Sequence, residues 1–576
     1  MLEELKHRIL NHLKAVYPDA PHAALALECI RTMGLKEADA PPSRQDDLWD
    51  QSDTFVISYG DSVIAAGEPP LRTLDRFLAD CLQDTVNSLH ILPFFPWSTD
   101  DGFAVVSNKE VSAALGDWED IERLTAKYRV MADVVINHCS AENGWFKNFL
   151  AGKDPGSDYF FTALPSDDLS KVVRPRTSDL LKRVETANGE KHVWCTFSHD
   201  QVDFDFSNPR VLLEFIRIIR LYLDHGIKIF RLDAVAFIWK DIGTDCLNLP
   251  QVHEIVRLLR ALIEHAEPSA IIITETNIPK RENLTYFGNA NEAHGIYNFS
   301  LPPLLLFTLL SGDCRHLKSW LMTMPPAQAG TFYLNFIASH DGIGLRPAEG
   351  LLSDREIESL LTTMARFGGQ ISWRALSGVS KRPYEINISL YDALQGTLSG
   401  VDRYQFERYL CAHAIMLALE GIPAFYIHSF LATSNDYVRY DKTQHKRHLN
   451  RYQWPWELLK QKLADEQSHH TRVLAALKRL IGTRSRQTAF HPNATQFTLH
   501  MGQEIFAFWR QSIRREQSIF CLNNITARPQ KVDLAEINLI DTEQWGDLIS
   551  GEMMADHLQI IELAPYQSVW LTNRVY

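Results

Sequence analysis

The sequence predicts an α/β protein built around a (β/α)8 TIM barrel. Eight short apolar runs, typical of buried parallel strands, alternate with longer stretches in which apolar residues have helical spacing. No glycine-rich phosphate fingerprint follows the first run, which argues against an open doubly wound sheet. The length of 576 residues suits one large barrel with insertions and an accessory domain.

Residues 1–48 are predicted to form an N-terminal helical extension. Apolar residues recur at helical spacing over 2–16, and a second such pattern covers 22–35. The segment 37–47 contains a pair of prolines and is predicted to be a loop. Charges are spread through residues 1–17, so this segment does not resemble a signal peptide.

The barrel is predicted to cover residues 49–485, with strands and helices in alternation. The first barrel helix is predicted over 70–82 and starts with Pro70, a residue type favoured in the first turn of a helix. The predicted strands cover residues 54–59, 88–94, 130–136, 227–232, 271–274, 295–299, 332–337 and 422–427. Residues that follow the strand ends of such a barrel form its active site.

Two polar stretches interrupt this alternation and are predicted to be inserted subdomains. They cover residues 140–206 and 345–400, and insertions on the active-site side of a barrel usually shape the binding cleft. Residues 486–576 contain five alternating apolar runs, which predict a small antiparallel β domain.

Composition excludes several classes of function. The hydrophobic fraction of 45% and the charged fraction of 22% are those of an ordinary folded protein. A net charge of −13 provides no extended basic surface, so nucleic acid and anionic membranes are not expected partners. The longest apolar stretches are interrupted by proline or charge, and no membrane span is predicted. Eight scattered cysteines without metal-ligand spacing predict neither disulfides nor a zinc site, which favours a reduced, cytoplasmic protein.

Three acidic residues follow predicted strands: Asp233, Glu275 and Asp341. A carboxylate at one strand end is common, but three at the same end of a barrel indicate a catalytic centre. Arg231 lies two residues before Asp233, so both side chains share one face of a strand and the guanidinium can keep the carboxylate ionised. Retaining glycosyl transfer requires such a nucleophile and a second carboxyl group about 5 Å away as acid and base. A third carboxylate can stabilise charge that develops in the transition state.

Ordered motifs around these residues resemble those of the α-amylase superfamily of glycoside hydrolases. They are Asp100-Asp101-Gly102-Phe103, the segment from Asp133 to His138, the segment from Arg231 to Val235, Glu275, and His340-Asp341. Their surroundings, among them HILPFFPWSTDDGF, VVRPR, RLDAV and SHDGIG, are similar to the sucrose phosphorylase subfamily and, within it, to the glucosylglycerate phosphorylases. The resemblance extends from the region of Trp49 to the end of the chain.

The resemblance implies a retaining phosphorylase, a hexosyltransferase that acts through a covalent glucosyl-enzyme. It implies Asp233 as nucleophile, Glu275 as general acid and base, and Asp341 as stabiliser of the transition state. The residues that it implies for binding the donor glucose are Asp100, His138, Arg231 and His340. Arg451 in the motif LNR matches a further sugar-binding position, on the donor or the acceptor side, although a structural ion pair is an alternative.

Phosphorolysis requires that an anion be held at the site, and arginine is suited to this task. The resemblance implies that Arg176 and Tyr384 contact phosphate or the acceptor from two loops. Arg382 and Glu385 depart from the sucrose phosphorylase pattern, which has an acidic residue and a glutamine at these positions. With Lys381 beside it, Arg382 favours an anionic acceptor such as D-glycerate, and a fructose phosphate would also fit.

The first hypothesis is therefore reversible phosphorolysis of 2-O-α-D-glucosyl-D-glycerate to α-D-glucose 1-phosphate and D-glycerate. Phosphorylases of sucrose, sucrose 6′-phosphate or glucosylglycerol are alternatives within the same subfamily. A hydrolase or transglucosidase would leave Arg176 without a purpose, and an inactive binding protein is disfavoured because all three carboxylates are present. No cofactor or metal is expected, phosphate is a co-substrate, and a homodimer is one option for the oligomeric state.

Overall fold

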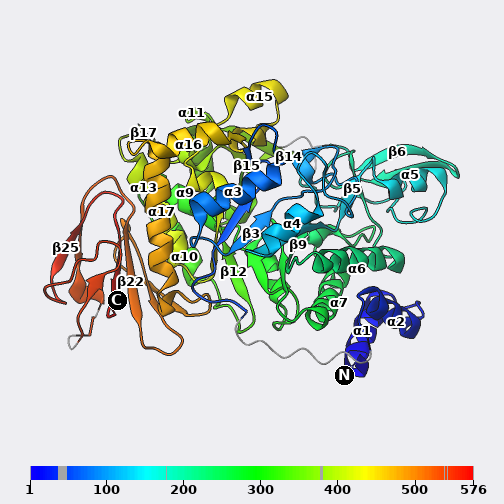
Figure 1. Cartoon of the computed structure of the whole chain (residues 1–576), viewed down its shortest axis with the longest axis horizontal. Helices are drawn as coiled ribbons and strands as arrows, with labels where there is room; N and C mark the ends of the chain where they lie inside the picture. Colours follow the sequence, from blue (N-terminus) through cyan, green and yellow to red (C-terminus); the bar gives the residue numbers. More distant parts are fainter. Residues whose placement is uncertain are drawn as a thin grey trace.

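The computed structural model describes residues 2–36, 48–176, 178–375, 381–537, 539–540 and 543–574, so the predicted loop 37–47 lies outside the described residues. At the centre of the molecule, eight parallel strands close into a barrel in the order β1-β18-β12-β11-β10-β9-β4-β3 (Figure 1). The predicted barrel is confirmed. Its strands are β1 (Phe55–Ser58), β3 (Ser88–Ile91), β4 (Arg129–Val135), β9 (Ile229–Asp233), β10 (Ile271–Thr274), β11 (Gly295–Tyr297), β12 (Phe332–Asn335) and β18 (Ile422–Tyr426).

Helices cover the outside of the barrel, and this explains why its strands are almost continuously apolar. Every strand residue except Arg129 is buried, because side chains meet the barrel interior on one face and helices on the other. The principal covering helices are α3 (Pro70–Leu82), α4 (Trp118–Thr125), α6 (Pro209–Asp224), α7 (Pro250–Ala266), α9 (Leu301–Ser311), α13 (Gln405–Ala418) and α17 (His469–Ser485). Local sequence fixes their starts: proline opens α3, α6 and α7, and a capping box of Asp117 with Asp120 opens α4.

Both stretches predicted as inserted subdomains contain secondary structure at the carboxyl end of the barrel. The elements after β4 are β5 (His138–Ser140), α5 (Gly144–Ala151), β6 (Leu181–Thr186), β7 (Gly189–Trp194) and β8 (Gln201–Asp203). The elements after β12 include β13 (Ile343–Gly344), α11 (Asp354–Arg366), β14 (Gln370–Ala375) and β15 (Lys381–Asn387), with β15 between the other two strands. The boundaries of the subdomains stay predictions.

The two ends of the chain lie on opposite sides of the barrel (Figure 1). The N-terminal helices α1 (Leu2–Val16) and α2 (His22–Thr32) pack against α7 and α6 respectively. The C-terminal region contains an antiparallel sheet in the order β20-β21-β22-β26-β24. Its strands are β20 (Thr495–Leu499), β21 (Ile505–Gln511), β22 (Ser518–Asn524), β24 (Gly546–Asp547) and β26 (Ser568–Thr572). The predicted C-terminal antiparallel β structure is therefore present.

Gly421, directly before β18, is a position where the barrel requires glycine. Its φ is +121°, and a Cβ atom there would lie 2.3 Å from the carbonyl oxygen of Tyr333. We expect Gly421→Ala to lower stability by about 2 kcal/mol or more, because backbone atoms cannot move aside. The apparent melting temperature measures this loss. Gly144→Ala is the matched control, because a Cβ there meets nothing within 4 Å, and an equal loss in both variants would contradict the explanation.

Candidate active site

A pocket at the carboxyl ends of the barrel strands brings together most of the predicted site residues. Its volume is about 510 Å³. The predicted residues that line it are Asp100, His138, Arg176, Arg231, Asp233, Glu275, His340, Asp341, Tyr384 and Glu385. Lys381, Arg382 and Arg451 are the predicted residues that do not line this pocket. The structure thus places residues from distant parts of the sequence around one cavity, while their roles remain proposals.

Asp233 is the last residue of β9 and is held by Arg231, two residues earlier on the same strand. The Nη1 atom of Arg231 lies 2.8 Å from Oδ1 of Asp233, as the alternation of side chains along a strand predicts. The same nitrogen contacts Asp133, which lies opposite Arg231 in the β4–β9 ladder. His90 Nε2 lies 2.7 Å from the other oxygen of Asp133. This buried chain from His90 to Asp233 fixes the direction of the Asp233 carboxylate.

Burial and the charge of Arg231 shift the pKa values of Asp133 and Asp233 in opposite directions. Burial raises the pKa of Asp133, but Arg231 and His90 outweigh this effect and bring that pKa down to about 2. Burial raises the pKa of Asp233 well above its ordinary value, and Arg231 opposes the rise. Among the described residues, Arg231 makes the one ion pair with Asp233, so its charge is what favours the carboxylate form.

Glu275, the residue after β10, is linked to Asp233 through the backbone. The amide of Ala234, the residue after Asp233, donates a hydrogen bond of 3.2 Å to Oε2 of Glu275. Ala234 has the left-handed φ of +54°, an uncommon conformation for a residue with a side chain. Burial raises the pKa of Glu275, Arg231 opposes the rise, and the charge of Asp341 adds to it. A carboxyl group with a raised pKa suits the role of a general acid.

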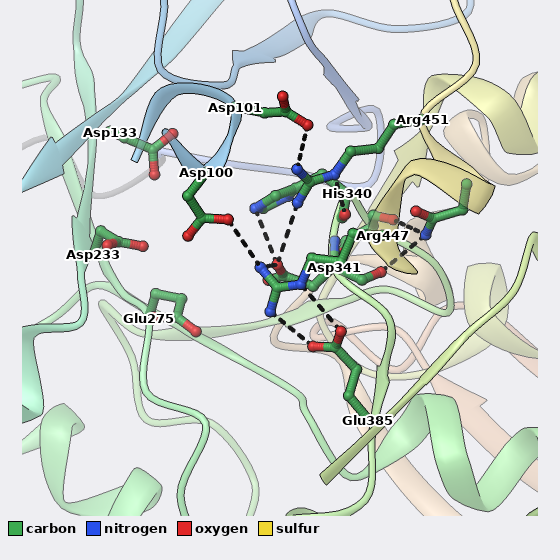
Figure 2. A network of polar contacts seen from close by, with 12 residues as sticks. Asp100, Asp101, Asp133, Asp233, Glu275, His340, Asp341, Glu385, Arg447 and Arg451 are labelled. Atoms are coloured by element: carbon green, nitrogen blue, oxygen red, sulfur yellow. Dashed lines mark hydrogen bonds and ion pairs between the residues drawn. The ribbon is translucent and has the colours of Figure 1, made fainter. Parts of the chain in front are cut away.

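Asp341 follows β12 and forms an ion pair with Arg447, a residue of the short helix η5 (Lys446–Asn450). Nη1 of Arg447 lies 2.5 Å from Oδ1 of Asp341, and His340 Nε2 lies 3.5 Å from the same oxygen. Burial raises the pKa of Asp341, but Arg447 and further positive charges outweigh it, so the pKa lies well below its ordinary value. Figure 2 shows Arg447 between Asp341, Glu385 and Asp100. Asp341 is therefore present as a carboxylate.

Phe103 contacts His340 and His138, two of the residues predicted to bind glucose. The His340 ring stacks on Phe103 with 5.1 Å between ring centres and 8° between planes, and His138 Nε2 lies 3.1 Å from the Phe103 carbonyl oxygen. Burial lowers the pKa of both histidines, so their neutral forms are favoured. Gln201 Nε2 lies 3.4 Å from Oδ2 of Asp100. Phe103, His138, His340 and Gln201 all line the pocket, and rings and hydrogen-bonding groups of this kind are suited to a sugar.

The prediction of sugar contact by Arg451 is not supported by its position. Arg451 is buried, with 2% of its surface exposed, and its Nη2 lies 4.0 Å from Oδ1 of Asp341. Its Nη1 donates to Oδ2 of Asp101 over 2.7 Å, and its Nε donates to the His340 carbonyl oxygen over 2.8 Å (Figure 2). The second aspartate of the DDGF motif holds the guanidinium away from the pocket. The structural ion pair, which was the alternative, is what the structure shows.

Arg176 and Tyr384 meet at the pocket entrance from the two insertions. The guanidinium carbon of Arg176 lies 5.4 Å from the centre of the Tyr384 ring and 5.8 Å from that of Phe197. No carboxylate of a described residue lies within ion-pair distance of Arg176, whose Nη1 contacts the Pro175 carbonyl oxygen at 3.5 Å. Its charge is therefore available to an anion. Arg176 also lines an outer cleft of about 1640 Å³ that continues the pocket towards solvent.

The structure places Lys381, but not Arg382, beside the outer cleft. Both residues are exposed at the start of β15, and successive side chains on a strand point to opposite faces. Lys381 lines the outer cleft. Arg382 faces Arg374 in the β14–β15 ladder and is absent from the described residues that line the pocket or the cleft. Of these two residues, Lys381 is the one placed to attract an acceptor.

Sequence reasoning missed several residues of the pocket. Arg447 is the most important, and the only signal for it is its place in the basic run before the LNR motif. Asp101 does not line the pocket, and its role in holding Arg451 has no signal in the DDGF motif. The other missed residues that line the pocket are Phe103, Phe197, Gln201, Ala234 and Asn277. Aromatic and amide side chains of this kind occur throughout the chain, so their types alone do not identify them.

No described helix is both long enough and apolar enough to cross a membrane. No group of three or more His, Cys, Asp or Glu side chains in the part of the chain that the structure describes is arranged to hold a metal ion.

Comparisons with known proteins agree with this geometry. The family model "Alpha amylase, catalytic domain" matches residues 81–341. A glucosylglycerate phosphorylase of Allomeiothermus silvanus is 39% identical over 574 residues, which cover 99% of each chain. A sucrose phosphorylase of Streptococcus mutans is 30% identical over 76% of this chain and 88% of its own. The crystal structure of sucrose 6F-phosphate phosphorylase from Thermoanaerobacter thermosaccharolyticum has the same fold, with a TM-score of 0.72 and 24% identity over 84% of this chain and 96% of its own. The chain therefore belongs to the sucrose phosphorylase subfamily of the α-amylase superfamily of glycoside hydrolases.

Proposed function

We propose that the protein catalyses the reversible phosphorolysis of 2-O-α-D-glucosyl-D-glycerate to α-D-glucose 1-phosphate and D-glycerate. The position of Arg176 carries this proposal. Next to a pocket that holds Asp233 and Glu275, this arginine has no carboxylate partner among the described residues. A hydrolase has no use for such a cation, whereas a phosphorylase must hold phosphate there. Similarity to a glucosylglycerate phosphorylase over 99% of the chain supports the choice of acceptor.

In the first step of the proposed mechanism, a carboxylate oxygen of Asp233 attacks the anomeric carbon of the glucosyl group. The bond from that carbon to the glycerate oxygen breaks. Glu275 is protonated before the step and transfers its proton to this oxygen, so D-glycerate leaves as an alcohol. Asp341 stabilises the positive charge that develops on the sugar ring.

In the second step, an oxygen of hydrogen phosphate attacks the anomeric carbon of the glucosyl-enzyme. The ester bond to Asp233 breaks, and Glu275, now ionised, accepts the phosphate proton. Arg176 holds phosphate oxygens that do not react. Two displacements at one carbon retain its configuration, and the chemistry requires no cofactor and no metal ion.

The acceptor is proposed to be an anion because two cations at the entrance, Arg176 and Lys381, form no ion pair with a described residue. Arg176 and Lys381 both line the outer cleft through which an acceptor enters. D-Glycerate and fructose 6-phosphate both carry negative charge, and the 39% identity with a glucosylglycerate phosphorylase, against 30% with a sucrose phosphorylase, favours glycerate. Phosphorolysis of sucrose 6′-phosphate is the second candidate, ahead of sucrose and glucosylglycerol, because Lys381 would serve it equally well.

Initial rates of phosphate release from α-D-glucose 1-phosphate test the proposed acceptor. We expect D-glycerate to give a rate at least about tenfold above glycerol or fructose, because Arg176 and Lys381 favour an anion, and above fructose 6-phosphate, because the chain is 39% identical to a glucosylglycerate phosphorylase. Equal enzyme without an acceptor is the control. A preference for fructose 6-phosphate would keep the phosphorylase class but overturn the acceptor, and full release without an acceptor would indicate hydrolysis.

A cytoplasmic location is also proposed. The eight cysteines are free, and all except Cys81 are buried, as expected for a protein in a reducing compartment. The partners are proposed to be small molecules, and a homodimer stays a prediction.

A further inference from the structure

We infer that Arg447 is a positioning residue that fixes Asp341 relative to Glu385 and keeps Asp341 ionised. The part played by Asp341 in this inference rests on the proposed function. Arg447 differs from Arg176, because its guanidinium is engaged by the protein itself.

All three guanidinium nitrogens of Arg447 contact carboxylates. Nε and Nη2 lie 3.0 and 2.8 Å from the two oxygens of Glu385, a bidentate arrangement that fixes the plane of the guanidinium. Nη1 lies 2.5 Å from Oδ1 of Asp341 and 4.0 Å from Oδ1 of Asp100. Figure 2 shows this bridge at the centre of the network. Because Glu385 occupies the fork, Arg447 is not free to bind phosphate in the same way.

Glu385 is a rigid anchor for this arginine. Only 3% of its surface is exposed. It lies on β15, the central strand of its sheet, opposite Gly344 on one side and Ser372 on the other. Two neighbouring strands therefore hold its backbone. Arg447 is attached to this fixed carboxylate and presents Nη1 to Asp341, so the strand determines where the Asp341 carboxylate points.

Arg447 is also the nearest positive charge to Asp341. The other charged or titratable groups around Asp341 are His340, Arg451, Arg231, Asp233, Glu275 and Asp100. His340 is neutral because burial lowers its pKa, and Arg451 is 4.0 Å away and paired with Asp101. Burial raises the pKa of Asp341, and Arg447 makes the largest contribution in the opposite direction. Removal of this charge should therefore make Asp341 easier to protonate.

The test compares pH profiles of kcat/KM for fluoride release from α-D-glucosyl fluoride, a donor that needs no particular acceptor. In Arg447→Gln we expect the acid limb to move upward by about 1 pH unit or more, because the cation that most strongly opposes the effect of burial on Asp341 is lost and Asp341 then joins Asp233 in limiting the rate at low pH. We also expect kcat to fall at least about tenfold, because the carboxylate is no longer aimed. Arg447→Lys keeps a charge without the fork, so its acid limb should stay nearer the wild-type position while kcat falls.

Two further variants separate this role from folding and from general charge effects. Lys446→Gln removes the charge next to Arg447 in the sequence, and both residues line the outer cleft. In the wild type, Nζ of Lys446 donates to the Ile371 carbonyl oxygen over 2.6 Å and forms no ion pair with a described residue. The acid limb of Lys446→Gln should stay within about 0.3 pH units of wild type. Arg447→Gln combined with Glu385→Gln removes the unpaired buried carboxylate, so it should regain melting temperature lost in the single variant. The displaced acid limb should remain.

The outcomes are distinguishable. A wild-type acid limb in Arg447→Gln, or in the double variant where the single variant does not fold, would overturn the inference. An equal shift in Lys446→Gln would also overturn it, because direct contact would then not matter. If wild-type protein releases fluoride but responds to neither phosphate nor any acceptor, the proposed phosphorylase function fails while the comparison of pH profiles still decides the role of Arg447.

Discussion

Replacement of Asp233 by asparagine is expected to lower kcat/KM by about 10⁴-fold or more in both directions of the proposed reaction. The amide has nearly the same shape as the carboxylate, but it cannot form the glucosyl ester on which both half-reactions depend. Initial rates of phosphate release with D-glycerate, and of glycerate release with phosphate, measure the loss. Asp241→Asn is the matched control because Asp241 is an exposed residue on the segment after the same strand.

Asp233→Asn should not lose stability although it loses activity. Burial raises the pKa of Asp233, which means that the folded protein holds its charged form at a cost in free energy. The neutral amide avoids this cost, so the apparent melting temperature of Asp233→Asn should equal or exceed that of wild type. An inactive variant that is also unfolded would not support the assignment, and full glucosyl transfer by a folded variant would remove Asp233 as nucleophile.

The contact between Arg231 and Asp233 could be predicted because it is local. Both residues lie on one apolar strand, where side chains two positions apart share a face, and the structure gives 2.8 Å between their charged atoms. The eight strands were predictable for a similar reason, because each is a short apolar run between longer helical patterns. Regular backbone geometry translates such patterns directly into positions.

The same rule explains why Lys381 and Arg382 do not line the cleft together. This segment was predicted as part of a loop, where neighbouring side chains can converge, but it begins β15, where they diverge. Arg447 could not be found by any local rule. Its partners Asp341 and Glu385 lie far away in the sequence, and only the closed barrel with its insertion brings them together. Which of several arginines meets which carboxylate depends on tertiary packing.

Replacement of Glu275 by glutamine should affect the two half-reactions unequally. Glycerate leaves as an alcohol and needs a proton, so we expect cleavage of glucosylglycerate to slow by about 10³-fold. Fluoride leaves with little help from an acid, and hydrogen phosphate is already an anion, so its attack depends less on Glu275 as the base that accepts its proton. Formation of α-D-glucose 1-phosphate from α-D-glucosyl fluoride and phosphate should therefore fall much less. Rates measured in parallel with the two donors give the ratio of the two losses, and this ratio tests Glu275 as the general acid.

The pH profile of kcat/KM provides an independent test of the role of Glu275. Burial raises the pKa of Glu275, so its protonated form persists to higher pH than that of an ordinary glutamate. The first step needs this form, and kcat/KM for glucosylglycerate should therefore be maintained below that pKa and fall as the pH rises through it. In Glu275→Gln this alkaline limb should disappear, because glutamine does not titrate. A limb that persists in the variant, together with equal losses for both donors, would assign the proton to another group and leave Glu275 with a role in shaping the pocket.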